Sequence, residues 1–174
     1  MTISQKNLLE DLSSKFSIEN NEKCFLITKR KKISQSQSSN SSFSNYIQCY
    51  DPISDTCTLK SSILYTKMDG TSACAINGKA YIFGGKGADS NRLNYIQCYD
   101  PISDICTLKS STLIDGMNHT SACAIDGKAY IFGGYIYSNG SNFYNYIQCY
   151  NPTTDTRTTK QATLSGNLQD TSAC

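Results

Sequence analysis

Short apolar runs of strand length recur along the chain, with polar turn residues between them. Within Tyr95–Tyr99, the side chains of Ile96 and Cys98 face one side of an expected strand, and Tyr95, Gln97 and Tyr99 face the other. The pair Asn77-Gly78 favours the positive φ angles of a tight hairpin turn. The pattern predicts four antiparallel strands, with no helix between them, at 71–76, 79–85, 95–99 and 106–109.

The same pattern returns after about 50 residues. Segments 46–62 and 95–111 both read YIQCYDPISDxCTLKSS and differ only at Thr56 and Ile105. A period of this length is typical of solenoids, propellers and arrays. The next unit predicts strands at 120–125, 128–134, 146–150 and 157–160. Because one small sheet cannot bury both of its faces, we expect the sheets to stack radially, as the blades of a β-propeller do.

The second and third units place a double glycine after an apolar strand, then a tyrosine some sixteen residues later, which is followed at once by Asp-Pro or Asn-Pro and an outer strand, whereas the worn first unit has Thr28-Lys29 in place of the glycines. This arrangement resembles the kelch repeat. The residues that carry the resemblance are Gly84, Gly85 and Tyr99 in one unit and Gly133, Gly134 and Tyr150 in the next. The expected fold is therefore all-β, an incomplete kelch-type β-propeller of about three four-stranded blades plus one extra strand.

The repeat boundaries predict five segments. They are an N-terminal tail or short helix at 1–13, a degenerate first blade at 14–62, a second blade at 63–111, a third blade at 112–162, and a linker with the first strand of a fourth blade at 163–174. Closed propellers have 4 to 8 blades. Three blades therefore form an open arc, close with other chains, or belong to a longer or degenerate ancestor.

The outer strands depart from the family pattern. Kelch repeats usually carry tryptophan a few residues after the Asp-Pro turn, and this chain has Cys57, Cys106 and Arg157 there. Losing an indole removes a large contact between blades, so we expect loose joints, above all at the last blade. Arg157 either packs its stem on a neighbour or faces water.

Charge and composition exclude several classes. The net charge is +2, without the basic excess of a nucleic-acid binder. The N-terminus does not read as a secretory signal and no apolar run has the length of a membrane span, so we expect a cytoplasmic protein without a nucleic-acid or membrane partner. The nine cysteines recur at fixed repeat positions, apart from Cys24, and no CxxC pair is present, which favours buried thiols over disulfides or zinc.

Candidate chemistry is sparse. Gly84–Gly87 lacks the spacing of a phosphate loop, and a glycine bend is the simpler interpretation. His119, the single histidine, has no nucleophile motif near it and is interpreted as a linker residue. The basic run Lys29–Lys32 is a nuclear signal, an anion patch or, as we favour, a solvated loop. We expect no cofactor, no metal and no catalytic residue.

Function is expected on the loops that differ between repeats. The loops between second and third strands, at 29–45, 86–94 and 135–145, and the inter-blade linkers, at 62–70, 111–118 and 162–170, should emerge on one face. The candidate partner-binding residues are Lys86, Asp89, Arg92, Tyr135, Tyr137, Phe143 and Tyr144. Exposed tyrosines are good interface anchors, although these aromatics could equally fold back over the blade edge.

The leading hypothesis is a non-enzymatic protein-interaction module or scaffold. The kelch resemblance implies such a role, because propellers of this kind serve as substrate receptors of ubiquitin ligases and as actin-binding proteins. Two alternatives remain open: a propeller enzyme or sugar-binding protein of kelch type, and a non-functional truncated duplicate. We also expect weak homo-oligomers, since an open arc exposes sheet edges and apolar faces.

Overall fold

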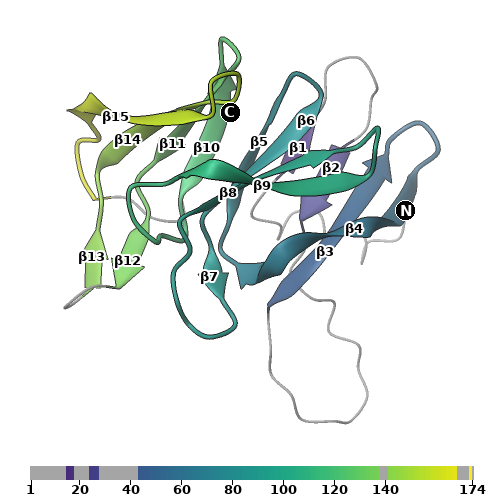
Figure 1. The fold of residues 1–174 in the computed structure, drawn as a ribbon, viewed down its shortest axis with the longest axis horizontal. Helices are drawn as coiled ribbons and strands as arrows, with labels where there is room; N and C mark the ends of the chain where they lie inside the picture. The colour runs from purple at the N-terminus through teal and green to yellow at the C-terminus, as the bar shows by residue number, and fades with distance from the viewer. Residues whose placement is uncertain (1–14, 18–23, 28–42, 138–140, 168–172, 174) are drawn as a thin grey trace.

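The computed structural model describes residues 15–17, 24–27, 43–137, 141–167 and 173. Within these residues every regular element is a β-strand, and antiparallel sheets lie side by side in an arc (Figure 1). The protein is therefore all-β, as predicted. The proposed helix at 1–13, the basic run at 29–32 and most of the fourth-blade strand at 171–174 lie outside the described residues.

Blades 2 and 3 are four-stranded sheets of the same order. Blade 2 consists of β5 (Ser72–Ile76), β6 (Lys79–Phe83), β8 (Tyr95–Asp100) and β9 (Ile105–Thr112). Blade 3 consists of β10 (Ser121–Ile125), β11 (Lys128–Phe132), β14 (Tyr146–Asn151) and β15 (Thr156–Thr163). All eight predicted strands are present. The second strands end at the phenylalanine before the double glycine, and both outer strands run further than expected.

Blade 1 is built from β1 (Lys15–Ser17), β2 (Cys24–Ile27), β3 (Ser44–Asp51) and β4 (Thr56–Asp69). The long β4 corrects the expectation that 62–70 is a loop. Its last residues pair with β7 (Lys86–Gly87), where Met68 is opposite Gly87 and Asp69 is opposite Lys86. The inter-blade linker thus becomes a strand, because blade 2 offers it an edge to pair with.

A second correction concerns residues 135–145, which were expected to form a loop. Strands β12 (Tyr135–Tyr137) and β13 (Ser141–Phe143) form a separate two-stranded hairpin there. The alternation of tyrosine and isoleucine suits a strand, but a three-residue run is too short to be read as one from sequence. Figure 1 places this hairpin and β7 at the same end of the arc.

Alternation along the strands separates two hydrophobic cores. We call the side of a blade that faces the preceding blade its leading face and the opposite side its trailing face. On β8, Tyr99 lies in the core of the first seam, between blades 1 and 2, with Ile47 and Ile82. Ile96 and Cys98 lie in the core of the second seam, between blades 2 and 3. The predicted facing of the YIQCY strand is confirmed, and each core belongs to a joint between blades.

Candidate functional site

The loops between second and third strands are fastened to the inter-blade linkers by backbone hydrogen bonds. The N–H of Gly85 donates to the Met117 carbonyl (2.7 Å), and the N–H of Met117 donates to the Leu93 carbonyl (3.1 Å). Asn118 and Tyr135 exchange two such bonds, at 3.1 and 2.8 Å. Residues 86–94, 113–118, 135–137 and 141–145 therefore form one surface, which we call the loop face. The expectation that these loops and linkers emerge together is met for this described part.

The double glycine allows the linker to approach this closely. Gly84 and Gly85 have φ angles of +61° and +109°, and a Cβ on Gly84 would lie 2.3 Å from the Met117 carbonyl oxygen. Gly133 and Gly134 have φ angles of 59° and 111°. Only glycine adopts such angles without strain. The glycine bend therefore serves the joint between blade and linker.

Two cation–π contacts join neighbouring blades across the loop face. The Arg92 guanidinium carbon lies 4.9 Å from the centroid of the Tyr135 ring, and Lys86 Nζ lies 5.8 Å from that of Phe43. Both distances are within the range of an attractive contact. The structure thus brings Arg92 and Tyr135, which are 43 positions apart in the sequence, into one cluster.

Two other predicted binding residues, Asp89 and Tyr144, differ in exposure. Asp89 is exposed and accepts hydrogen bonds from the backbone N–H and the side-chain Nδ2 of Asn91, at 3.1 and 2.8 Å. Tyr144 stacks on Tyr146 with ring centroids 4.8 Å apart and packs against the core of the second seam. Burial raises the pKa of the Tyr144 hydroxyl, with a further contribution from Asp115. This tyrosine thus folds back, as one alternative held.

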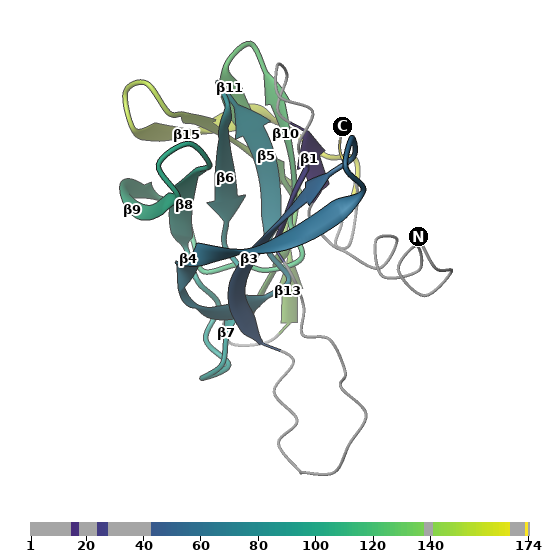
Figure 2. The same cartoon turned by 90° about the vertical axis from the view of Figure 1, so that its right-hand side faces the viewer.

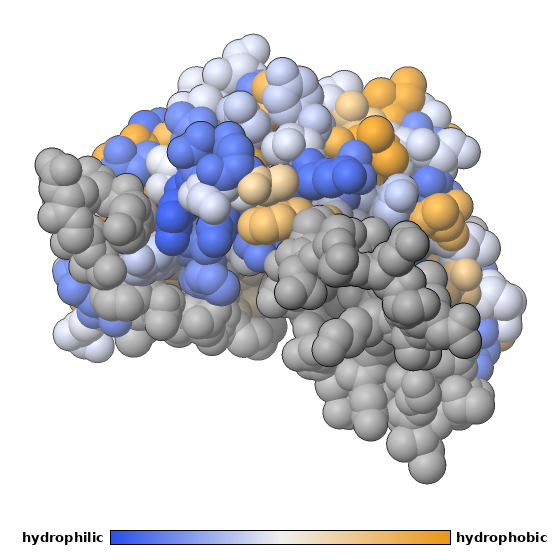
Figure 3. Space-filling model, turned by 90° about the horizontal axis from the view of Figure 1, so that it is seen from below, coloured by the Kyte–Doolittle hydropathy of each residue, from blue (hydrophilic) through white to orange (hydrophobic). Residues whose placement is uncertain are grey.

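Tyr137 is the last residue of β12 and Phe143 is the last residue of β13. Their side chains lie outside the described part of the structure, so their role in binding stays a prediction. Figure 3 views the molecule from the end that carries β7 and this hairpin. Hydrophilic residues form most of the described surface there, with smaller hydrophobic areas between them.

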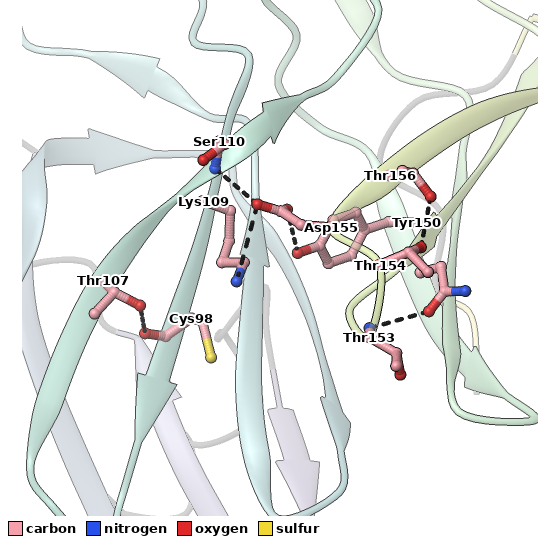
Figure 4. A network of polar contacts seen from close by, with 10 residues as sticks. Cys98, Thr107, Lys109, Ser110, Tyr150, Thr153, Thr154, Asp155 and Thr156 are labelled. Carbon is pink, nitrogen blue, oxygen red and sulfur yellow. Dashed lines mark hydrogen bonds and ion pairs between the residues drawn. The ribbon is translucent and has the colours of Figure 1, made fainter.

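Sequence reasoning missed a polar network that recurs in the second and third units. The Tyr99 hydroxyl donates to Asp104 Oδ1 (2.9 Å), and Asp104 Oδ2 accepts from the Ser61 N–H of blade 1 (3.1 Å). The Tyr150 hydroxyl donates likewise to Asp155 (2.8 Å), which accepts from the Ser110 N–H (3.0 Å) (Figure 4). Each aspartate thus ties the tyrosine of its own blade to the outer strand of the preceding blade.

These aspartates have left-handed backbones, with φ angles of 53° at Asp104 and 49° at Asp155. Aspartate tolerates this conformation better than most residues. Burial acts to raise the pKa of Asp155, but hydrogen bonds from Tyr150 and the Ser110 N–H, with Lys109 nearby, hold it below its usual range. The signal in the sequence was the Asp five positions after each repeat tyrosine.

A buried glutamine completes each seam. Gln97 Oε1 accepts from the Tyr65 N–H (2.7 Å), and Gln148 Oε1 accepts from the Ile114 N–H (2.9 Å). Both amides also approach a methionine sulfur, that of Met68 or Met117. Buried polar groups have to be satisfied in this way, so the glutamine of YIQCY fixes the linker of the preceding blade.

Comparison with protein-family models assigns these units. The model described as the Kelch motif matches residues 69–111 and 117–160, which together make up half of the chain. The chain belongs to the kelch-repeat family. A comparison with curated proteins found no match.

Among solved structures, the kelch arc is similar to one titled "Structure of YjhT", with a TM-score of 0.65 and 16% sequence identity. The alignment covers 88% of this chain and 51% of that one. At this identity the likeness concerns the fold alone. The chain spans about half the length of that structure.

The kelch tryptophan positions have different roles in the three blades. Cys57 is exposed, and Cys106 packs against the core of the first seam. Arg157 donates from Nε to the Thr112 carbonyl of blade 2 (3.2 Å). The arginine therefore ties blade 3 to its neighbour by a hydrogen bond, which neither of the two expected alternatives included.

Other candidate chemistry is readily placed. His119 lies in the linker, where its backbone N–H donates to the Gly70 carbonyl (2.8 Å). The seven cysteines with described side chains are thiols: Cys49, Cys57, Cys74, Cys98, Cys106, Cys123 and Cys149. Across the described ranges, no group of three or more His, Cys, Asp or Glu could hold a metal ion. A search of the same ranges found no helix of the length and apolarity that crossing a bilayer requires.

Proposed function

We propose that this kelch arc is a non-enzymatic protein-binding module that contacts its partner through the loop face. The observation that carries the proposal is the fastening of two dissimilar segments, loop 86–94 and the hairpin of β12 and β13, at one end of nearly identical blades. Backbone hydrogen bonds hold both segments to the linker between them, and the Arg92–Tyr135 contact joins the two segments to each other. Loops positioned by a rigid scaffold are a common way to build a binding surface.

The proposed contact residues have complementary characters. Asp89 and the neighbouring loop tip are exposed and polar, whereas Tyr135 is half-buried beside the Arg92 guanidinium. Aromatic and arginine side chains are the residue types that dominate binding energies. The arrangement suits a protein surface with apolar and charged groups close together.

The partner classes implied by the kelch resemblance are ubiquitin-ligase substrates and actin, and both belong to this proposal, as does a cytoplasmic location. The alternative of an enzyme or sugar-binding protein has no specific observation in its favour among the described residues. A truncated duplicate without function is the outcome to expect if no specific partner exists.

Affinity enrichment from cytosol with matched variants tests the proposal. Ala88→Glu places a charge at the exposed tip of loop 86–94, and Ala124→Glu places the same charge at an exposed position of β10, next to the turn at the opposite end. We expect wild type and Ala124→Glu to enrich the same proteins and Ala88→Glu to lose them. Each retained candidate is then titrated as a purified protein. Equal capture by both variants, or no enrichment over bare resin, would contradict the loop face as the binding site.

A further inference from the structure

Blade 1 is less covered on its leading face than blade 2 is: Gln48 and Tyr50 are half-buried there, whereas their equivalents Gln97 and Tyr99 are each 1% exposed in the first seam. Its leading face carries Tyr46, Leu59 and Ile63, all exposed, with Leu59 at 62%. Figure 2 shows β3 and β4, which carry these residues, at the near end of the arc. Exposed apolar residues gathered on one sheet face indicate a surface that packs against something.

The opposite end of the arc is the trailing face of blade 3. Ile125 is 49% exposed, whereas Ile76, its equivalent in blade 2, is 3% exposed inside the second seam. Three more apolar residues of this face are half-buried, while their blade 2 equivalents are buried: Tyr130 for Tyr81, Phe132 for Phe83 and Ile147 for Ile96. The trailing face of blade 2 packs against blade 3. The equivalent face of blade 3 is therefore more exposed.

The polar groups of a seam are also present at the two ends. Lys109 Nζ lies 4.0 Å from Asp155 across the second seam, and the Ser110 N–H donates to the same carboxylate. The repeat places Lys160 and Gln161 at these positions in blade 3, and Asp55 at the aspartate position in blade 1. Asp55 accepts from the Tyr50 hydroxyl (2.9 Å), just as Asp104 and Asp155 accept from their tyrosines.

From this correspondence we propose that a second copy of this chain docks head to tail, with the trailing face of blade 3 against the leading face of blade 1. Two chains then close a six-bladed ring through two identical joints. A head-to-tail contact produces a closed ring when the rotation from one subunit to the next is a whole fraction of a full turn. In a six-bladed ring, three blades cover half a turn, so two chains complete it.

The occupant is a copy of this chain because the residues required are those of its own seams. In both internal joints, a trailing face of this sequence covers a leading face of this sequence. Segments 46–62 and 95–111 differ at one position, so β3 and the first part of β4 repeat nearly the sequence of the strands with which blade 2 faces blade 1. The association depends on concentration, because no covalent link holds the two arcs together.

Light scattering of the purified chain over a range of concentrations is the first test. We expect the mass to rise from 19.2 kDa toward twice that value. Leu59→Lys on the leading face and Ile125→Lys on the trailing face should each remain monomeric at concentrations where wild type is dimeric. Ile102→Lys, at a position that is 94% exposed in a turn of blade 2, is the control and should dimerise as wild type does.

Mixing the two end variants distinguishes head-to-tail from face-to-face association. Each variant keeps one intact end, so an equimolar mixture should form a dimer with a single joint, which the separate variants do not form. Circular dichroism and thermal unfolding confirm that every variant is folded. A folded wild type that stays at 19.2 kDa at the highest concentration would overturn the proposal. So would a dimer that Ile125→Lys leaves intact, because that dimer would use one face twice.

Discussion

Tyr50 and Tyr99 lie in nearly identical sequences, yet their surroundings differ. Tyr99 is 1% exposed and belongs to the core of the first seam, whereas Tyr50 is half-buried at the end of the arc. Gln97 and Gln48 differ in the same way: Gln97 is buried against the preceding linker and Gln48 is half-buried. The comparison teaches that in this fold the neighbouring blade determines burial and the unit's own sequence does not.

The largest expected effect is on the free energy of unfolding after truncation of these tyrosines. Tyr99→Ala should cost ~3–5 kcal/mol, the range for removing a large buried aromatic. Tyr50→Ala should cost about 1 kcal/mol, as expected for a partly exposed side chain. Urea denaturation of both variants measures the difference. A loss below ~0.5 kcal/mol for Tyr99→Ala, well short of a core truncation, would mean that the assigned strand register is wrong.

The glycine bend provides a second comparison, between a crowded and an open position with similar positive φ angles, +61° at Gly84 and +69° at Gly127. Gly84→Ala forces a Cβ toward the Met117 carbonyl oxygen in a left-handed conformation, and we expect a loss of ~2–4 kcal/mol. Gly127 also has a positive φ, but no atom lies within 4 Å of its added Cβ, so Gly127→Ala should cost about 1 kcal/mol. Equal losses of stability for the two variants, measured by thermal unfolding, would show that the Met117 carbonyl oxygen does not crowd the Gly84 position.

A smaller effect is expected from the aspartate of the second seam. Asp155→Asn removes the charge that accepts from Tyr150 and Ser110 and should cost about 1–2 kcal/mol at pH 7. Asp55→Asn, at the end of the arc, is the matched control and should cost less. If both substitutions cost the same, the carboxylate contributes within its own blade and not across the seam.

The pH dependence of stability follows from the lowered pKa of Asp155. The folded state releases this proton more readily than the unfolded chain, so the stabilisation is complete above the unfolded pKa of about 4. It is lost as pH falls through the folded pKa. Between about pH 5 and pH 3, wild type should therefore lose more stability than Asp155→Asn, as measured by urea titrations at each pH. If the free energies of unfolding of wild type and Asp155→Asn fell in parallel with pH, Asp155 would not contribute to the loss of stability in acid.

The blades could be predicted from the sequence because their signals are local. Asn77-Gly78 and Asp126-Gly127 mark the hairpins, and all four carry the positive φ angles that such turns need. The alternation in YIQCY gave the two faces of its strand correctly, and the period gave the stacking. The turn and strand signals lie within one unit, and the period is read directly from the repetition of the sequence, so none of them depends on knowing which residues meet in space.

The joints could not be predicted, since their partners come from another unit. Nothing near Asp104 in the sequence indicates that its carboxylate accepts from the Ser61 N–H, and nothing near Met68 indicates that it pairs with Gly87. The contact of Arg92 with Tyr135 likewise joins two blades. The loop face was predicted as a region, but the pairing of its residues required the structure.

The most direct test of whether the neighbouring blade determines burial uses two cysteines at the same repeat position. Cys57 is exposed on the uncovered leading face of blade 1. Cys106 packs in the first seam, where burial, and to a lesser degree Cys98, raises its pKa to about 11. At pH 8 and low protein concentration, iodoacetamide should modify Cys57 at least ~100-fold faster, because alkylation requires an accessible thiolate. Peptide mass spectrometry measures both rates in one sample, and equal rates would contradict the account.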